Sequence, residues 1–403
     1  MKICHISSFW PNRIAHTHYT DNLIGGIFAN QPEQQLVLAE RSAARAETER
    51  FSCVPCFDRD SDYVADIVAA ARAAGRPDVA VIQYSNDLFG DDNRLPRLVA
   101  ALAAEGIRPV VNCHSIYPDG WRTHFEPGRT AVEFDRALAE HAALLTVHTQ
   151  RMKRDLLARG IDEARIAVIP HGSEAFPARD PGESRARLGI PPDAKVVLFF
   201  GFIWPGKGID FLLSVFARVR RQVPDAYLFV GGHTRHPRWS IYVRYLRARA
   251  RLLGFGDRSR FWGKYVPEEM IADMFSAASI VAMPYRQDYS SVSGVVHESA
   301  GSGKLMLCSR IAKFDEVTEI DPTLTVGPKD TGAWVDGMVR LLTDQPYAEA
   351  MRAKIVRFGQ ATSWPNVGKM HLETYARLVA GQHPQALASA VAGVGAALPT
   401  TEG

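Results

Sequence analysis

The stretch "VVLFFGFIWPGKGIDFLL" (residues 196–213) decides the fold of the second half of this 403-residue chain. It begins with a short apolar run, which predicts a buried strand over residues 196–202, and apolar residues at helical spacing then predict a helix over 209–222. The turn between them is rich in glycine, which lets the backbone approach a ligand closely, and Lys207 lies where its charge suits a phosphate. Such turns also occur for structural reasons alone, so this one indicates an α/β unit rather than a function.

The same alternation of short apolar strands and longer helices runs through the rest of the chain. In the first half, we expect strands at residues 2–9, 50–56, 79–85, 109–115, 144–149 and 166–170, and helices at residues 31–45, 61–74, 94–105, 130–142 and 150–159. In the second half, we expect further strands at residues 227–231, 261–263, 280–283 and 305–309, and further helices at residues 241–253, 267–277, 295–301 and 331–343. Near-continuous apolar strands separated by amphipathic helices are typical of parallel sheets covered on both faces.

These elements predict two doubly wound, Rossmann-like α/β domains that face each other across a cleft, with ligands at the carboxyl ends of the strands. We place the N-terminal domain at residues 1–173 and the C-terminal domain at residues 195–363. The polar stretch between them, residues 174–194, contains proline and glycine and is interpreted as a linker. Residues 364–380 predict a last helix, and the Ala-, Gly- and Pro-rich residues 381–403 predict a disordered tail.

Composition narrows the classes of function. The chain is 46% hydrophobic and 23% charged with a net charge of +3, which is ordinary for a globular protein and too small to indicate a nucleic-acid partner. Its apolar runs have the length of strands and its N-terminus lacks the pattern of a signal peptide, so we expect a cytoplasmic location. The pair Cys53-x-x-Cys56 ends a predicted strand and has no second pair, so we expect ordinary strand cysteines rather than a redox or zinc site.

The stretch "HESAGSGKL" (residues 297–305) resembles a phosphate-binding P-loop at first sight. A P-loop has a glycine five residues before its Gly-Lys, a hydroxyl residue after it, and lies between a strand and a following helix. Here the glycine position holds Glu298, the residue after Lys304 is Leu305, and the helix comes before the strand. We therefore reject nucleotide hydrolysis, and expect Lys304 to be solvated in a turn.

Two further strand ends carry residues that could bind a ligand. Small residues in "YRQDYSSVSG" (residues 285–294) precede a predicted helix, whose free N–H groups favour an anion. Glu298 lies about one turn further along, among apolar neighbours, where a carboxylate can accept two hydrogen bonds from a vicinal diol such as ribose. The alternative for Glu298 is a solvated helix residue. His114, at the end of the strand in "VVNCHS", suits a hydrogen bond to a sugar oxygen, although a lone histidine is more often structural.

Together these motifs resemble retaining glycosyltransferase family 4, which has the GT-B fold. The resemblance spans roughly residues 1 to 380, and its motifs are "KICHISSFWP", Gly25-Gly26, "VVNCHSIYP", "HTQRMKRDLLARG", "RIAVIPHG", "VVLFFGFIWPGKGIDFLL", "FWGKYVPEEMIADMFSAASIVAMPYR", "SSVSGVVHESAGSGKLMLCS" and "SWPNVGKMHLETYARL". It implies transfer of a sugar from a nucleotide-sugar donor with retention of configuration, without a metal ion or other cofactor. It also implies that the last helix crosses back to the N-terminal domain.

The resemblance assigns roles to individual residues. His114, Lys207 and Glu298 match the catalytic set: a histidine near the donor sugar, a lysine on the diphosphate, and the second acid of a Glu-x7-Glu motif, which holds the ribose. Gly26 matches a glycine turn that closes over the phosphates. The donor-binding residues predicted in this way are Gly25, Gly26, Gly201, Lys207, Arg286, Ser290, Ser291, Ser293, Gly294 and Glu298.

Two departures from the family pattern concern the donor. The first acid of Glu-x7-Glu is replaced by Ser290, and the phosphate-binding arginine is replaced by Phe202 or Trp204. Losing one charge-assisted contact costs about 1.5–3 kcal/mol of binding. We hypothesise that Arg286 substitutes for the missing arginine, and expect an altered choice of donor rather than a dead enzyme.

No nucleophile–base pair is evident for a double displacement, so we predict front-face transfer, in which the leaving diphosphate deprotonates the acceptor hydroxyl. The alternatives are a sugar-nucleotide epimerase and a non-catalytic nucleotide-sugar-binding relative. A nicotinamide oxidoreductase would need a GxGxxG turn after the first strand, which the sequence lacks.

The acceptor is expected at aromatic-rich loops of the first domain, residues 9–26 and 115–128, and to contain a sugar or be lipid-linked. The basic, amphipathic residues 235–260 suggest peripheral contact with the inner face of an anionic membrane. The alternative is a solvated helix face packed by Trp239, Tyr242 and Leu246.

Overall fold

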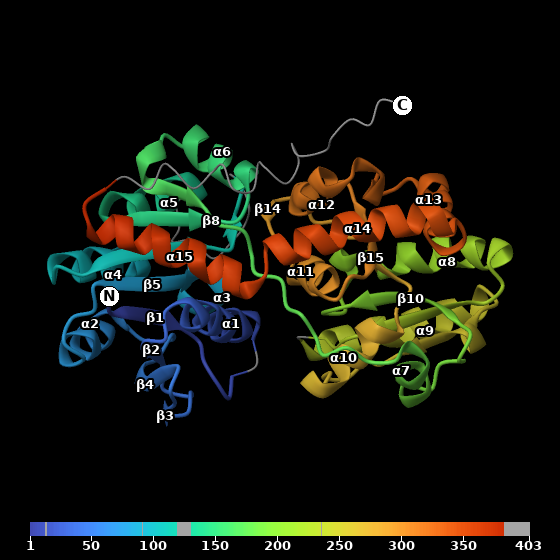
Figure 1. Cartoon of the computed structure of the whole chain (residues 1–403), viewed down its shortest axis with the longest axis horizontal. Helices are drawn as coiled ribbons and strands as arrows, with labels where there is room; N and C mark the ends of the chain where they lie inside the picture. Colours follow the sequence, from blue (N-terminus) through green and yellow to red (C-terminus); the bar gives the residue numbers. More distant parts are fainter. Residues whose placement is uncertain (13, 91, 119–129, 235, 383–403) are drawn as a thin grey trace. The chain divides into compact units, whose positions relative to one another are not determined.

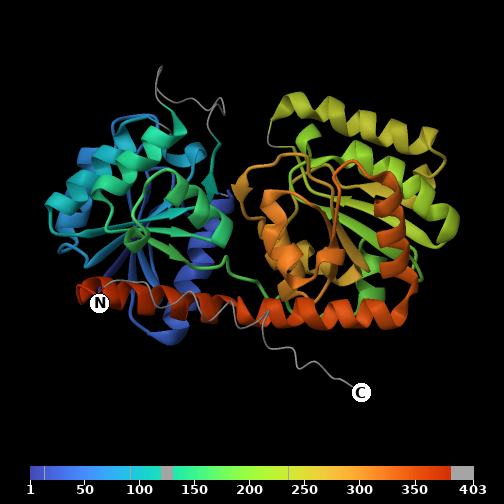
Figure 2. The same cartoon turned by 90° about the horizontal axis from the view of Figure 1, so that it is seen from above.

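The computed structural model describes residues 1–12, 14–90, 92–118, 130–234 and 236–382. The described chain forms two compact units, each built on its own wholly or mainly parallel sheet (Figure 1 and Figure 2). The first unit contains Met1–Gly172, Tyr289–Val292 and residues 362–382, and the second contains Ser173–Asp288 and Ser293–Ala361. The segment interpreted as a linker thus belongs to the second unit, where Arg179, Ser184 and Arg187 all donate to the buried carboxylate of Asp273.

The first unit has an eight-stranded sheet in the order β3-β4-β2-β1-β5-β6-β8-β9, parallel except for β3. Its strands are β1 (Ile3–Ser7), β2 (Gln35–Glu40), β3 (Ala46–Glu47), β4 (Phe51–Phe57), β5 (Val79–Tyr84), β6 (Arg108–Cys113), β8 (Leu144–Val147) and β9 (Ile166–Val168). Its helices are α1 (Ala15–Asn30), α2 (Val64–Ala73), α3 (Asn86–Phe89), α4 (Arg94–Ala104), α5 (Ala131–His141), α6 (Gln150–Ala158) and α15 (Trp364–Val379). Two short strands, β7 (Ser115–Ile116) and β14 (Ser290–Ser291), form an antiparallel pair.

Two predicted elements of this unit are wrong. The helix expected at residues 31–45 is the strand β2, whose residues are nearly all buried because β2 pairs with both β1 and β4. The acceptor loop expected at residues 9–26 is largely the helix α1, which buries Tyr19, Leu23 and Ile27 on one face. The polar residues of α1 mask this apolar stripe in the sequence. The loop expected at 115–128 lies mostly outside the described residues.

The second unit has a six-stranded parallel sheet in the order β12-β11-β10-β13-β15-β16. Its strands are β10 (Lys195–Phe200), β11 (Ala226–Gly231), β12 (Ser259–Phe261), β13 (Ile280–Met283), β15 (Leu305–Ser309) and β16 (Thr325–Val326). Its helices are α7 (Pro181–Arg187), α8 (Ile209–Gln222), α9 (Ser240–Leu252), α10 (Glu268–Ala277), α11 (Gly294–Gly301), α12 (Asp315–Ile320), α13 (Thr331–Thr343) and α14 (Gln345–Ala361), and five short 3₁₀ helices connect them, η2 (Pro205–Lys207), η3 (Pro237–Trp239), η4 (Gly256–Arg258), η5 (Ala312–Phe314) and η6 (Pro322–Leu324).

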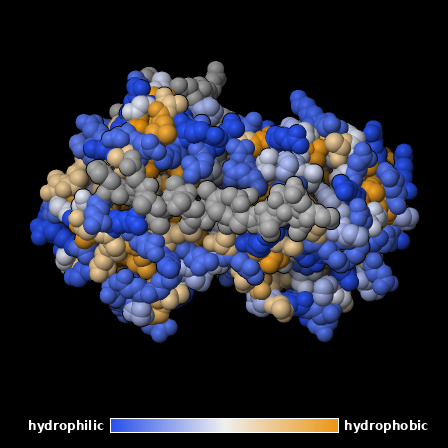
Figure 3. All heavy atoms as spheres, turned by 45° about the horizontal axis from the view of Figure 1, so that its top comes forward, coloured by the Kyte–Doolittle hydropathy of each residue, from blue (hydrophilic) through white to orange (hydrophobic). Residues whose placement is uncertain are grey.

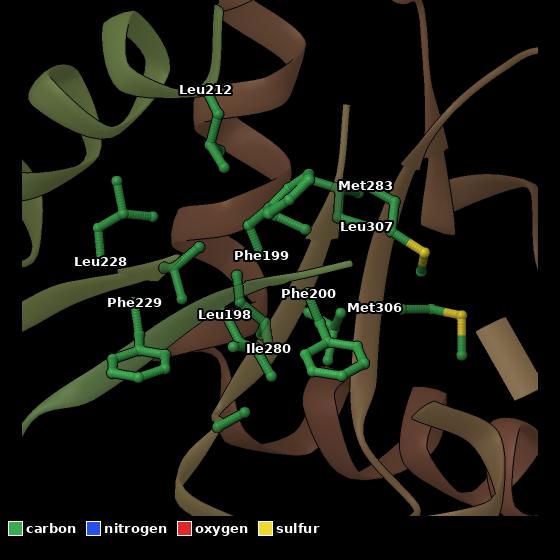
Figure 4. Packing of buried hydrophobic residues seen from close by; sticks show 14 of the residues in the cluster. Leu198, Phe199, Phe200, Leu212, Leu228, Phe229, Ile280, Met283, Met306 and Leu307 are labelled. Carbon is green, nitrogen blue, oxygen red and sulfur yellow. The ribbon is translucent and has the colours of Figure 1, made fainter. Parts of the chain in front are cut away.

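The predicted strand β10 forms the centre of this sheet. Leu198, Phe199 and Phe200 lie among buried side chains of neighbouring strands and of α8 (Figure 4). From β10 the chain proceeds through β11 to β12 on one side, and returns to β13 and β15 on the other. The sheet therefore reverses its direction of growth between β10 and β13, and such a switch point at the carboxyl ends of strands is where open α/β sheets bind ligands.

Three details bear on the sequence predictions. Cys53 and Cys56 are free thiols on β4, where burial raises their pKa values to about 11 and about 12, so neither is a reactive thiolate. Lys304 is not solvated as predicted: its Nζ donates to the carbonyl groups of Ser276 and Ala278 at 3.0 and 3.3 Å, at the C-terminal end of α10. Among the described residues, no helix is both long and apolar enough to cross a membrane.

Candidate functional site

Lys207 lies in η2, at the end of the glycine turn that follows β10. Its Nζ is 3.5 Å from the centroid of the Tyr285 ring, which follows β13 on the other side of the switch point. The turn fits this position only with glycine at 208, because Gly208 has φ +67° and an added Cβ would lie 2.0 Å from the carbonyl oxygen of Pro284. Burial, and then the neighbouring Lys313, hold the pKa of Lys207 well below its usual range. Both influences make the charged form of Lys207 unfavourable. An anionic ligand would stabilise that charged form, so the position suits an anion.

Lys313 lies in η5, after β15, the strand next to β13. The ring of the next residue, Phe314, lies 5.1 Å from that of Tyr285, and the backbone N–H of Ala312 donates to Asp288 at 2.7 Å. Burial lowers the pKa of Lys313 to about 8. The turns after three adjacent strands thus bring Lys207, Tyr285 and Lys313 to one edge of the sheet. Lys313 was not predicted as a site residue from the sequence. Recognising it would have required knowing that β13 and β15 are neighbours in the sheet.

Glu298 lies on α11, the helix that begins at Gly294 with Ser293 as its N-cap residue. Its Oε2 atom is buried and has no hydrogen-bond partner among the described residues. Burial, and then the charge of Glu174, raise the pKa of Glu298 to about 8. A buried carboxyl oxygen without a partner is costly, and a ligand with hydroxyl donors would supply what the protein does not. Glu298 therefore has the environment of a binding residue rather than of a solvated one.

Gly201 lies close to this group, whereas Arg286 is engaged elsewhere. A Cβ added to Gly201 would lie 3.8 Å from Val295 of α11 and 4.0 Å from the Tyr285 hydroxyl. The Arg286 guanidinium pairs with Asp210 at 2.9 Å, and Asp210 also accepts from the Tyr242 hydroxyl at 3.2 Å.

The remaining predicted donor residues lie in the first unit. Ser290 and Ser291 form β14, where they pair with Ile116 and Ser115 of β7. The predicted glycine turn at Gly25 and Gly26 is wrong, since both residues lie inside α1.

Gly26 instead permits close helix packing. An added Cβ on Gly26 would lie 2.2 Å from the carbonyl oxygen of Trp364, and one on Gly368 would lie 2.1 Å from the carbonyl carbon of Gly26. The backbones of α1 and α15 therefore touch at this pair of glycines.

His114 belongs to a group of imidazoles that the sequence analysis did not recognise as a group. Its Nε2 faces the side-chain oxygen of Gln83 at 3.0 Å, and its Nδ1 faces His148 Nε2 at 3.2 Å. Burial, and then the charges of neighbouring histidines, hold the pKa of His114 well below its usual range. His148 Nδ1 faces the carbonyl oxygen of Ile169, which only accepts, so the proton of neutral His148 lies on Nδ1.

His148 in turn follows β8, the strand beside β6, which precedes His114. Histidines after neighbouring parallel strands were visible in the sequence, but their meeting depends on the order of the strands. At this edge the unit offers the neutral imidazole of His114, which suits hydrogen bonds to uncharged polar groups such as sugar hydroxyls.

The fold and these sites define a pair of Rossmann-like units with a polar group at the switch point of the second. A family model described as "Glycosyl transferases group 1" matches residues 194–344, and one described as "Glycosyl transferase 4-like domain" matches residues 26–172. The chain belongs to the group 1 glycosyl transferases.

Curated proteins that are similar to this chain are also glycosyltransferases. The chain is 31% identical over 269 residues to the D-inositol 3-phosphate glycosyltransferase of Corynebacterium urealyticum, covering 63% of this chain and 61% of that protein. It is 29% identical to the protein of the same name from Nocardia farcinica, over 65% of this chain and 57% of that protein. The matched region thus spans about three fifths of the length of these relatives.

Solved structures establish the GT-B fold. Anabaena Alr3699/HepE in complex with UDP matches with a TM-score of 0.70 and 16% identity, covering 93% of this chain and 100% of that one. Sucrose-phosphate synthase from Thermosynechococcus elongatus matches with a TM-score of 0.69 and 18% identity, covering 95% and 100%.

Proposed function

We propose that the protein is a retaining glycosyltransferase that moves a sugar from a UDP- or GDP-linked donor to an acceptor hydroxyl, in glycan, glycolipid or secondary-metabolite biosynthesis. The observation on which this proposal depends is the buried, unpartnered Oε2 of Glu298 beside a switch point that also holds Lys207. A nucleoside diphosphate fits both residues, because its anionic phosphates can pair with Lys207 and the vicinal diol of its ribose can donate to Glu298.

In the proposed donor complex, the Glu298 carboxylate accepts hydrogen bonds from the two ribose hydroxyls. The pKa of about 8 in the ligand-free protein means that this carboxyl group is mostly protonated at pH 7. Hydroxyl donors stabilise the ionised form, so donor binding lowers the pKa of Glu298 and releases a proton. This proton release is a signature of the ribose contact.

We propose that Lys207 and Lys313 together bind the donor diphosphate, with Lys313 supplying the charge of the arginine that this chain lacks. Lys313 suits this role because its charge lies close enough to Lys207 to lower the pKa of that lysine, whereas the Arg286 guanidinium pairs with Asp210 of α8. Two ammonium groups that disfavour each other's charge in the empty site gain a common partner when an anion binds.

We propose front-face transfer without a metal ion. The bond between the anomeric carbon and the diphosphate oxygen breaks, the acceptor oxygen bonds to the same face of that carbon, and the acceptor proton passes to the departing phosphate oxygen. The two lysines stabilise the charge that develops on the diphosphate. His114 serves as a neutral hydrogen-bonding residue to the donor sugar rather than as a base, in keeping with the lowered pKa of its imidazole, and a sugar hydroxyl takes the place of Gln83 at its Nε2.

The acceptor is proposed to contain a sugar or to be lipid-linked, with the protein in the cytoplasm and in peripheral contact with a membrane through residues 235–260. Arginine is frequent in this segment, and no acidic residue occurs between His236 and Gly256. This part of the proposal is independent of the donor chemistry.

A thermal-shift screen against UDP- and GDP-sugars tests the donor, because a ligand stabilises the folded state by mass action. We expect stabilisation by one nucleotide series, and its loss in Lys207→Ala and Glu298→Ala. Stabilisation that survives in both variants would contradict the proposed site. Product analysis separates the alternatives: an epimerase converts the donor without an acceptor, and a non-catalytic relative binds the donor without turnover.

A further inference from the structure

The helix α9 exposes an unusual amount of apolar surface. Among the described residues, the exposed large hydrophobic side chains are Ile241 at 64%, Tyr245 at 45%, Leu252 at 88% and Leu253 at 38%, and all of them lie on α9 or at its C-cap. On the face drawn in Figure 3, by contrast, hydrophilic residues predominate and hydrophobic ones form small separate groups. One helix therefore concentrates the exposed apolar side chains, which marks it as a contact surface.

The exposed residues form a stripe. At about 100° per residue, Ile241, Tyr245, Ala248 and Leu252 fall within about 60° of one another around the helix axis. The buried residues of α9, Val243, Leu246 and Ala250, lie on the opposite side, against the core of the second unit. The helix thus has one apolar stripe that packs on the core of the second unit and another that faces solvent. The second stripe is not needed to pack the helix on its own unit. We name Ile241, Tyr245, Ala248 and Leu252 the outer stripe.

Positive charge flanks the outer stripe. Arg244 and Arg251 are exposed along one side of it, and among the described residues neither has an ion-pair partner. Arg249, on the other side, donates to the Tyr245 hydroxyl at 3.2 Å and to Ser214 at 2.9 Å. Because acidic residues are missing from this part of the sequence, the surface has a strongly positive rim.

An anionic membrane surface fits this arrangement better than a second copy of the chain does. In a two-fold symmetric dimer the same patch meets itself, so the arginine rims would face each other and repel. At a membrane, the outer stripe enters the boundary between headgroups and acyl chains, and the arginines contact lipid phosphates. A helix with a narrow apolar stripe and a basic rim has the composition of an interfacial helix rather than of a spanning one.

We propose that the outer stripe of α9 inserts shallowly into an anionic membrane, with Arg244 and Arg251 on lipid phosphates, and so holds the second unit at the bilayer surface. The Tyr242 ring stacks on that of Tyr245 at 6.0 Å, and its hydroxyl bonds Asp210, the partner of Arg286. The docked helix is therefore linked through Asp210 of α8 to Arg286, which lies in the turn after β13 beside the proposed donor site.

Vesicle flotation of the full chain tests this proposal, with phosphatidylcholine vesicles compared with vesicles that also contain phosphatidylglycerol. We expect binding only to the anionic vesicles, and weaker binding as salt is raised. Arg244→Gln/Arg251→Gln lowers the partition coefficient by about 10- to 30-fold, given roughly fivefold for each basic residue at an anionic surface. Ile241→Ser/Leu252→Ser lowers it by about 10-fold or more, because both side chains lose their apolar insertion.

Arg218→Gln/Arg221→Gln is the matched control, since it removes the same charge from exposed positions on the neighbouring helix α8. We expect it to change partitioning by less than about threefold, since these arginines belong to α8 and not to the helix that is proposed to insert. All the substituted side chains are exposed, so thermal unfolding should confirm that each variant folds. Binding that does not depend on anionic lipid would overturn the proposal. So would a partition coefficient that falls as much in the α8 control as in the α9 variants. A dimer that dissociates in Ile241→Ser/Leu252→Ser, without vesicle binding, would overturn it in favour of self-association. This inference rests on the membrane contact proposed above for residues 235–260, so failure here would remove that contact; because donor binding is measured separately, it would leave the transferase chemistry intact.

Discussion

The Nζ of Lys207 lies 3.5 Å from the centroid of the Tyr285 ring, so the ammonium contacts the face of an aromatic ring. A cation–π contact stabilises a partly desolvated ammonium less well than a carboxylate or phosphate does. The environment of the Lys207 ammonium is therefore unfavourable without an anion beside it. An anionic ligand that pairs with this ammonium would remove part of that cost and gain affinity from it. Function and stability should consequently respond in opposite directions when Lys207 is replaced.

Replacing Lys207 with methionine should raise the thermal stability of the ligand-free protein and abolish donor binding. The side chain keeps its apolar stem but loses an ammonium whose pKa is lowered by burial and by Lys313. A lysine with a lowered pKa destabilises the folded state most at pH values below that pKa, and the cost disappears as pH rises toward its unfolded value. The stabilisation by Lys207→Met should thus be larger at pH 7 than at pH 10, as thermal unfolding at both pH values would show. A variant that is destabilised at pH 7 would contradict this account.

Lys207→Ala and Glu298→Ala should each lower turnover by about 100-fold or more if the lysine stabilises the leaving diphosphate and the glutamate holds the donor ribose. Initial-rate kinetics with the donor identified by the thermal-shift screen would measure this effect. Near-normal rates in both variants would exclude the proposed chemistry at this edge of the sheet.

Glu298 should make donor affinity depend on pH. Its pKa of about 8 lies above the ordinary value of 4.5, so between these pH values the folded state holds a proton that the unfolded chain has lost. The contribution of this group to stability is therefore full below pH 4.5 and is lost as pH rises through about 8. Donor affinity should rise over the same range, because binding needs the carboxylate, and calorimetry in buffers of different ionisation enthalpy should detect proton release. Glu298→Gln should remove both the slope and the proton release; a pH-dependence that persists in this variant belongs to another group.

The sequence was most informative where one segment determines its own structure. The turn after β10 places Lys207 as predicted at a strand end, because glycine spacing and the helix that follows are local features. Glu298 was singled out by its apolar neighbours, and its Oε2 atom is indeed buried. For the same local reason, strand β13 and helix α8 match their predicted bounds.

Features that depend on the order of strands could not be predicted in this way. Lys313 and His148 become neighbours of the predicted residues only because β15 lies beside β13 and β8 lies beside β6. Lys304 has a charge that suggests solvent, but carbonyl groups at the end of α10 accept hydrogen bonds from its ammonium. In each case the missing information was which element packs beside the residue.

Lys313 should contribute to donor binding in a way that distinguishes it from Arg286. We expect Lys313→Gln to weaken binding of the nucleoside diphosphate by about 10-fold or more, the worth of one charge-assisted contact. Titration calorimetry with the diphosphate and with the corresponding nucleoside measures this, because a phosphate contact affects only the former. Lys329→Gln, which removes an exposed charge from the same unit, is the control. A loss found in Arg286→Gln but not in Lys313→Gln would restore arginine 286 as the substitute for the missing cation.

Gly26 should be a stability residue rather than a phosphate-binding one. In Gly26→Ala the new Cβ would lie 2.2 Å from the Trp364 carbonyl oxygen, so α1 and α15 must separate. We expect the free energy of unfolding to fall by about 1–3 kcal/mol or more, as for other overpacked sites. Gly25→Ala is the matched control, because its Cβ would meet only the flexible end of Arg50 at 3.3 Å and alanine favours a helix. Chemical denaturation should show a loss of stability in the first variant and none in the second, whereas a glycine that closes over phosphates would lower donor affinity in Gly26→Ala and leave its stability intact.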